Sequence, residues 1–216
     1  MRWLSYIIPQ IIYRTTTAHN SDIRVLIEQG NYKLLVHGSR QSGEYITNLW
    51  KHALSVFKVY PSPEISSILV LGVAGGSVIH LLHAIFPDAV ISGVDIDGEM
   101  IRIGKKYFSL GSIEGLTLHE QDARTFVSQC VKKKRRWDLV IVDTYIGPEV
   151  PPFVADVHFL SDLKSILSSH GIVIFNYLRE FEYGKLSELL LKKLRNIFPI
   201  VKDTGINSNR FFYCTK

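Results

Sequence analysis

Runs of apolar residues alternate with helical patterns along most of the chain. Short aliphatic stretches are each followed by a longer stretch in which apolar residues recur at helical spacing. The predicted strands cover 68–71, 90–94, 116–120, 139–142 and 172–175, and the predicted helices cover 77–86, 100–107, 125–131, 160–167 and 186–197. Strands that are apolar along their whole length are buried on both faces, so the pattern predicts a mostly parallel sheet between two layers of helices.

Two further apolar segments, 200–202 and 211–214, are separated by too few residues for a helical crossover. They are therefore expected to pair antiparallel through a loop at 204–209. The predicted fold class is α/β, with a Rossmann-like, mostly parallel sheet that ends in an antiparallel C-terminal hairpin. This combination is typical of S-adenosylmethionine (AdoMet) methyltransferases and not of dehydrogenases.

The first sixty residues follow a different pattern. Segments 23–28 and 32–37 alternate apolar with polar residues and flank the turn Gln29-Gly30-Asn31, which predicts a β-hairpin. A helix is expected over 45–60, where Pro61 and Pro63 end it. We therefore expect a small N-terminal β-hairpin region with a linking helix at 1–60 and an AdoMet-binding domain at 61–216. The hairpin should cover the cofactor pocket.

The first thirteen residues are strongly apolar, which raises the question of a targeting or membrane segment. Pro9 and Gln10 interrupt the run, and no small-residue cleavage site follows. The run is also shorter than the roughly 20 residues of a membrane span. We expect it to pack on the domain, with contact to a partner as the less favoured alternative.

Composition narrows the class of protein. Of the 216 residues, 46% are hydrophobic and 21% charged, which is ordinary for a globular protein and argues against extended disorder. Cys130 and Cys214 are far apart, and the eight histidines form no ligand pattern, so we predict no metal site and a cytoplasmic location. The net charge of +5 owes much to the run 132–136, which is typical of a solvated helix end and only a weak signal for nucleic acid.

A glycine-rich turn is the strongest chemical signal. It connects the strand at 68–71 to the helix at 77–86, and Gly72, Ala74, Gly75 and Gly76 would let the backbone approach a ligand at the N-terminus of that helix. A dinucleotide-binding fingerprint needs glycine where Ala74 and Ser77 stand, so a nicotinamide cofactor is disfavoured. A tight packing turn without a ligand is the alternative.

Acidic residues follow the next two strands. Asp95 comes 23 residues after Gly72, where a carboxylate can accept hydrogen bonds from both ribose hydroxyls, although it could instead cap the next helix. For Asp97 a ligand role and a cap role are about equally favoured. Asp122 and Ala123 follow the third strand, where the carboxylate could accept from an adenine amine and the Ala123 N–H could meet a ring nitrogen. Asp122 could also cap a helix.

The fourth strand ends in Asp143, and Tyr145 follows it closely. Ligands of open α/β sheets lie at the carboxyl ends of the strands, so both side chains are expected to face the reacting end of the cofactor. Asp143 is our candidate for orienting or deprotonating an acceptor, and Tyr145 for shaping its pocket. A buried structural aspartate is the alternative for Asp143.

Several motifs together resemble the spermidine synthase-like family of polyamine aminopropyltransferases. The resemblance runs through LLVHGSRQSGEYITNLWKHAL (34–54), LVLGVAGGSVIHLL, GVDIDGEMIRIGKKYF (93–108), QDAR and DLVIVDTYIGP. It implies AdoMet or decarboxylated AdoMet as cofactor, with Gln41 and the turn 72–76 against its aminoacyl side. It also implies Asp95 on ribose, Asp122 with Ala123 on adenine, and Asp143 beside the transferable group.

The chain departs from that family where a polyamine would bind. Aminopropyltransferases carry an aspartate at the position of Gly75, an acidic pair at Ile46 and Thr47, and a tyrosine at Trp50. They also have a second aspartate after the fourth strand and a tyrosine in the loop 204–209, and this chain has neither. An ammonium group taken out of water needs charged partners, so these departures argue against polyamine binding.

We therefore expect an AdoMet-dependent methyltransferase that acts on a small-molecule acceptor. An aminopropyltransferase of altered amine specificity and a non-catalytic nucleoside-binding protein are the alternatives. Neither a nucleic-acid partner nor a membrane span is expected, and a homodimer is compatible with the pattern.

Overall fold

The central sheet confirms the predicted fold class. The computed structural model describes residues 2–216. Its main sheet consists of β5 (Ser67–Leu71), β6 (Val90–Asp95), β7 (Leu116–Glu120), β8 (Trp137–Val142), β9 (Leu167–Leu178), β10 (Ile200–Ile206) and β11 (Asn209–Thr215). The strand order is β10-β11-β9-β8-β5-β6-β7. Strands β5 to β9 pair in parallel, whereas β11 pairs antiparallel with both β9 and β10.

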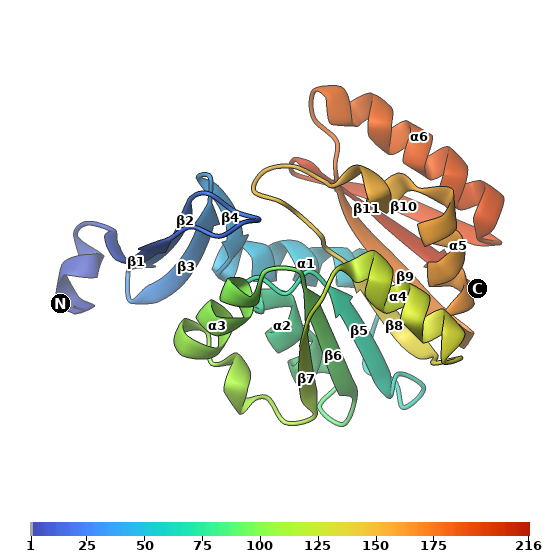
Figure 1. Ribbon diagram of the computed structural model, residues 1–216, viewed down its shortest axis with the longest axis horizontal. Coiled ribbons are helices and arrows are strands. Elements are labelled where there is room, and N and C mark those ends of the chain that lie inside the picture. Colours follow the sequence, from blue (N-terminus) through green and yellow to red (C-terminus); the bar gives the residue numbers. More distant parts are fainter. Residues whose placement is uncertain (1) are drawn as a thin grey trace.

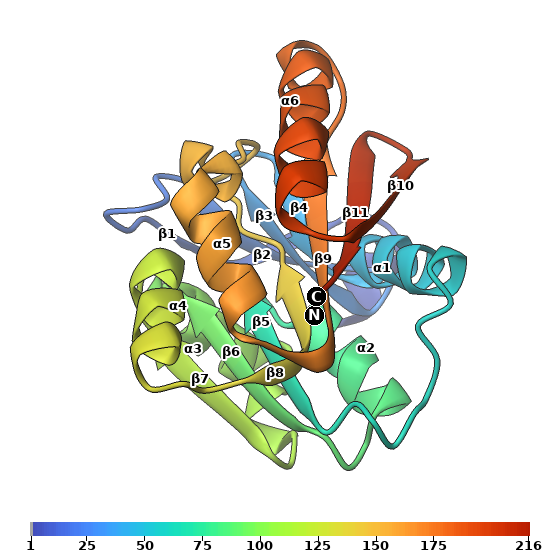
Figure 2. The same ribbon diagram turned by 90° about the vertical axis from the view of Figure 1, so that its right-hand side faces the viewer.

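Helices cover both faces of this sheet (Figures 1 and 2). Apolar side chains of α1 (Glu44–Val56) and α2 (Ser77–Ile85) pack on one face, where Ile68, Val70 and Ile141 are buried. On the other face lie α4 (Ala123–Lys132), α5 (Val157–Ser165) and α6 (Glu182–Ile197). The remaining helix, α3 (Gly98–Tyr107), packs against the N-terminal region. Because both faces are covered, β5 and β8 are buried almost completely, as their uniform hydrophobicity predicted.

The N-terminal region is a four-stranded antiparallel sheet, larger than the predicted hairpin. The predicted pair is present as β2 (Ile23–Glu28) and β3 (Asn31–Val36), joined by Gln29 and Gly30 with positive φ. The flanking strands β1 (Gln10–Thr15) and β4 (Ser39–Ser42) were not predicted. They lack clear alternation, so only pairing with the central hairpin reveals them.

The apolar start of the chain packs only in part as expected: Ser5 is buried, and its carbonyl accepts a hydrogen bond from Gln29 N–H (2.8 Å) at the hairpin turn. The 3-10 helix η1 (Arg2–Tyr6) and the following residues leave large apolar side chains in solvent, with Trp3 67% and Ile7 72% exposed. In Figure 1 this segment lies at the end of the molecule farthest from α6. Within residues 2–216 no helix has the length and hydrophobicity that crossing a membrane requires.

The N-terminal sheet is attached to α3 through a core of its own. Ile23, Val25 and Leu34 pack against Met100 and Ile103 of α3. Polar contacts reinforce this packing, since the Thr17 hydroxyl and the Asn20 amide both donate to Asp97 at the start of α3. These contacts fix the N-terminal sheet on α3. Its last strand, β4, ends beside the glycine turn, where Gly75 N–H donates to Ser42 Oγ.

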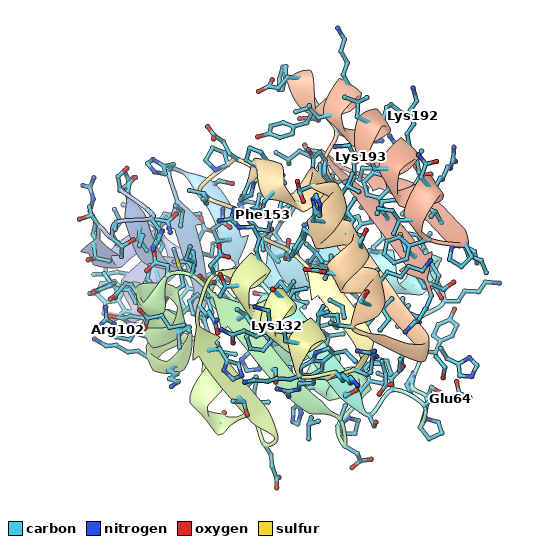
Figure 3. All side chains as sticks on the ribbon, turned by 45° about the vertical axis from the view of Figure 1, so that its right-hand side comes forward. Glu64, Arg102, Lys132, Phe153, Lys192 and Lys193 are labelled. Carbon is cyan, nitrogen blue, oxygen red and sulfur yellow. The ribbon has the colours of Figure 1, made fainter. Side chains whose placement is uncertain are left out.

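Several element bounds differ from the predicted ones. The strand predicted at 172–175 is the longest of the sheet, because β9 pairs with β8 on one side and β11 on the other. The loop predicted at 204–209 is a short turn, since β10 continues to Ile206 and β11 begins at Asn209. The basic run is exposed at the end of α4, where Figure 3 labels Lys132, as a solvated helix end requires.

Gly72 directly follows β5 and lies against the backbone that follows β8. Its φ is +94°, and a Cβ atom at this position would lie 2.1 Å from the carbonyl oxygen of Asp143. Glycine is needed here both for the left-handed backbone and for the space it leaves. The sequence predicted a close approach of this backbone to a ligand, whereas the approach that the structure shows at Gly72 is to the backbone just after β8.

We predict that Gly72→Ala lowers the free energy of unfolding by about 3 kcal/mol or more, because backbone strain and overpacking act together. Gly38→Ala is the matched control, since Gly38 has φ +76° but nothing within 4 Å of an added Cβ. That control should lose only about 1–2 kcal/mol. Urea unfolding of both variants measures the difference, and equal losses would show that the contact with Asp143 costs nothing.

Candidate functional site

Two cavities open at the carboxyl ends of the central strands and share a wall. The strand-end cavity, of about 440 Å³, is bordered by the ends of β5, β6, β7 and β8. The α1 cavity, of about 380 Å³, lies between the glycine turn, α1 and the turn that joins β10 to β11. The residues common to both walls are Gln41, Gly72, Ala74, Asp143 and Tyr145. This is where open α/β sheets bind their ligands.

Asp95 holds the glycine turn in place at the edge of the strand-end cavity. Its Oδ2 accepts hydrogen bonds from the N–H groups of Val73 (2.9 Å) and Ala74 (3.0 Å), and its Oδ1 accepts from Asp97 N–H (2.9 Å). Burial raises the pKa of Asp95, although these three bonds act to lower it. A carboxylate can accept about four hydrogen bonds, so capacity remains for a ligand hydroxyl.

Asp97 is a helix cap and lies outside both cavity walls. Its Oδ1 accepts from Glu99 N–H at the start of α3 (3.0 Å), and its Oδ2 accepts from Thr17 Oγ1 (2.6 Å) and Asn20 Nδ2 (2.8 Å). Only 3% of the residue is exposed. Of the two roles that the sequence allowed for Asp97, the hydrogen bonds support the cap.

Asp122 and Ala123 border the far end of the strand-end cavity. The Asp122 carboxylate caps α4 by accepting from Thr125 N–H (3.0 Å) and forms an ion pair with Arg124 (3.2 Å). Burial alone would raise the pKa of Asp122, but these contacts lower it on balance. The Arg124 guanidinium carbon lies 5.0 Å from the ring centroid of Phe153, which Figure 3 labels in the loop before α5. That apolar ring closes the cavity at this end.

Gly75 and Gly76 are part of the glycine turn but border neither cavity. Gly75 N–H donates to Ser42 Oγ (2.8 Å) at the end of β4, and a Cβ on Gly75 would lie 2.8 Å from that hydroxyl. A Cβ on Gly76 would meet the Leu110 side chain at 2.2 Å. The structure thus assigns both glycines to close packing, with the N-terminal sheet pressed against the turn at Gly75.

Asp143 lies at the junction of the two cavities and is the centre of a polar network. Its Oδ2 accepts from Trp50 Nε1 (2.9 Å) and its Oδ1 from Asn176 Nδ2 (2.8 Å). Asn209 in turn donates to Asn176 Oδ1 (2.8 Å) and to the Tyr145 hydroxyl (3.3 Å). Burial raises the pKa of Asp143 to about 6, even though the bonds from Asn176 and Trp50 act to lower it.

Tyr145 and Gln41 complete the shared wall. Burial and then the nearby Asp143 carboxylate raise the pKa of the Tyr145 phenol well above its ordinary value, so it stays protonated at neutral pH. Gln41 Nε2 donates to the carbonyl of Gly147 (2.7 Å) and so connects the N-terminal sheet to the loop after β8. Among the described residues, the buried Thr144 Oγ1 has no hydrogen-bond partner, and Thr144 borders the strand-end cavity.

Sequence reasoning missed Trp50, Asn176 and Asn209 as members of this site. Asn176 directly follows the predicted strand 172–175, so the rule that ligands lie at the carboxyl ends of strands could have found it. Trp50 was noted only as a departure from the family, because its helical pattern is that of a core residue and does not show that its indole donates to Asp143. Among the described residues no group of three or more His, Cys, Asp or Glu side chains is arranged to hold a metal ion.

The comparisons identify the class to which this site belongs. The chain belongs to the spermine/spermidine synthase domain family, whose model matches residues 44–206. It is 29% identical over 138 residues to a polyamine aminopropyltransferase of Vibrio vulnificus, a match that covers 64% of this chain and 44% of that protein. It is also 28% identical over 159 residues to the bovine eEF1A lysine and N-terminal methyltransferase, covering 68% of this chain and 22% of that protein.

A solved structure supports the same fold. Human methyltransferase-like protein 13, crystallised in complex with S-adenosylhomocysteine (SAH), superposes with a TM-score of 0.65 at 23% identity, covering 76% of this chain and 80% of that one. The chain spans less than half the length of the two curated relatives above. Relatives of both transferase types therefore share this domain, and the family alone does not distinguish their reactions.

We predict that Asp143 titrates near pH 6 in the folded protein, above its ordinary value of 3.8. Between these two values the folded state binds more protons than the unfolded state. The contribution of Asp143 to the free energy of unfolding is therefore present below about pH 4 and is lost as the pH rises through about 6. The carboxyl carbon signal in a ¹³C NMR titration measures the pKa directly.

Two variants test the cause of this shift. Asn176→Ala removes a donor to the carboxylate and should raise the pKa of Asp143 further. Asp143→Asn should remove the part of the pH dependence of stability between about 4 and 6 that Asp143 contributes, whatever its effect on stability at a single pH. A midpoint near 4 in the unchanged protein would contradict the prediction.

Proposed function

We propose that the protein is an AdoMet-dependent methyltransferase that acts on a small-molecule acceptor. The observation that carries this proposal is the composition of the α1 cavity, in which Asp143 is the only carboxylate among the described residues. A site for a polycationic amine needs several acidic groups. A nucleoside cavity that adjoins an acceptor cavity without them favours methyl transfer over aminopropyl transfer.

The strand-end cavity has the donors and acceptors that an adenosyl group requires. Asp95 would accept from one ribose hydroxyl, Asp122 and Ala123 would face the adenine, and the unpartnered Thr144 hydroxyl would gain a partner. Gln41, in the wall between the cavities, would face the aminoacyl end. Bound AdoMet would supply an activated methyl group. SAH bound to a protein of this fold is consistent with that cofactor.

The polar network defines what Asp143 would contribute. A pKa of about 6 leaves the carboxyl largely ionised at neutral pH, so it can accept a proton or a hydrogen bond from an acceptor. Trp50 and Asn176 fix the orientation of its oxygens, and Asn209 orients the Tyr145 hydroxyl beside them. Tyr145 would restrict the approach of the acceptor to a single direction.

We predict that Asp95→Asn weakens the binding of AdoMet by about 1–3 kcal/mol, because a charge-assisted hydrogen bond to the ribose is lost. Asp97→Asn is the matched control, since Asn also caps helices well and Asp97 lies outside the cavity walls. Isothermal calorimetry with AdoMet and SAH measures both variants. Equal affinity in the unchanged protein and in Asp95→Asn would refute the ribose assignment.

A second prediction separates the two transferase types. Calorimetry with AdoMet, decarboxylated AdoMet and methylthioadenosine should find AdoMet bound at least as tightly as its decarboxylated form, and putrescine should not yield spermidine. Gly75→Asp should not create that activity, because a side chain at 75 collides with Ser42 and Phe108. A preference for decarboxylated AdoMet together with efficient spermidine formation would overturn the proposal. Tight AdoMet binding with no acceptor found in a broad screen would favour a non-catalytic role.

A further inference from the structure

The charges of the α1 cavity are unevenly placed. Among the described residues that line it, Arg40 and Asp143 carry the only formal charges. Asp143 lies at the inner end, against the strand-end cavity, and both its oxygens already accept hydrogen bonds from the protein. Arg40 is exposed on β4. The two ends of the cavity therefore present different chemistry to an acceptor.

The Arg40 side chain lies over an aromatic ring and has no anionic partner among the described residues. Its guanidinium carbon lies 5.2 Å from the ring centroid of Tyr45, which also lines the cavity. Within residues 2–216 it takes part in no ion pair within 4 Å. Contact with an aromatic face leaves the N–H donors at the edge of the guanidinium available, and their fork matches a carboxylate. Arg40 also lines a second pocket, which Glu44 borders, but Glu44 does not line the α1 cavity.

The rest of the cavity wall combines an apolar stretch with neutral polar side chains such as Ser77 and Asn209. The apolar stretch consists of Ile46 and Leu49 of α1 together with Val78 and Leu178. Ile46 stands where the aminopropyltransferases carry an acidic residue. The cavity therefore suits a molecule with an apolar body, and a second cation on that molecule would meet Arg40 and be repelled.

We propose that the acceptor is a small carboxylate that pairs its anionic group with Arg40 and presents an amine or hydroxyl group to Asp143. This rests on the proposed function for the identity of the acceptor cavity. The assignment reverses the charge preference of a polyamine site. It restricts the acceptor to compounds with one anionic end, an apolar body and a nucleophile.

Matched ligands can test the charge preference in the full-length protein saturated with SAH. The probes are 6-aminohexanoate and 3-phenylpropanoate, each with its own amide, and 1,6-diaminohexane. Dissociation constants from ligand-observed NMR should be about tenfold lower for each carboxylate than for its amide, as expected for a charge-assisted hydrogen bond. The diamine should bind more weakly than 6-aminohexanoate.

Variants show whether Arg40 is responsible. Arg40→Gln should abolish the preference for carboxylates, and Arg40→Glu should reverse it in favour of the diamine. Arg102→Gln is the control for loss of one positive charge, since the Arg102 side chain is 75% exposed on α3, away from both cavities (Figure 3), and should retain the preference. Carboxylates that bind no better than their amides, or a preference that survives in Arg40→Gln, would overturn the assignment.

The experiment distinguishes failure of the Arg40 assignment from failure of the proposed function. SAH affinity is measured first, and Arg40→Gln should leave it unchanged because Arg40 does not line the strand-end cavity. If SAH does not bind, the proposed function fails. The carboxylate series then still reports on Arg40 in the free protein.

Discussion

The close approach of Gly72 to the backbone that follows β8 is the constraint on which the rest of the site depends. With φ at +94° and no Cβ, Gly72 lets the glycine turn pass directly over the backbone carbonyl of Asp143. The end of β8 therefore lies in the wall of both cavities. A side chain at this position would separate the two strands where the cavities meet.

The N-terminal sheet also helps to shape the site. It presses on the glycine turn through Ser42, is held to α3 through Asp97, and brings Gln41 into the wall between the cavities. Its own four strands bury few side chains, so its packing on α3 supplies stability that such a small sheet lacks alone. The sequence placed this region over the pocket, and Val36 and Gln41 do border the strand-end cavity.

The family is shared by aminopropyltransferases and methyltransferases, and the chemistry of one cavity wall can distinguish them. A nucleoside site needs polar groups at successive strand ends, and this chain has Asp95, Asp122 and Asp143 there. An amine site needs a set of carboxylates around the acceptor, whereas Ile46 and Leu49 line the α1 cavity and Gly75 packs against Ser42 outside both cavities. Asp143 is compatible with either reaction. The discrimination therefore rests on the neutral and cationic residues that surround it.

The sequence by itself determined the alternation of strands and helices, the glycine turn and the presence of an aspartate at three strand ends. These features are local or periodic, so a short window of residues contains them. The hairpin turn at Gln29 and Gly30 was predictable for the same reason, whereas the edge strands β1 and β4 were not, because only pairing with the central hairpin defines them. The role of Asp97 and the packing of the first residues also depended on neighbours far along the chain.

Only the tertiary structure decided which side chains share the site. Trp50, Asp143, Asn176 and Asn209 come from four separate elements, and the strand order brings them within hydrogen-bond distance. Arg40 lines the α1 cavity, and β4, which carries it, ends against the glycine turn. No spacing along the chain encodes such contacts, since each depends on how elements distant in sequence pack in space.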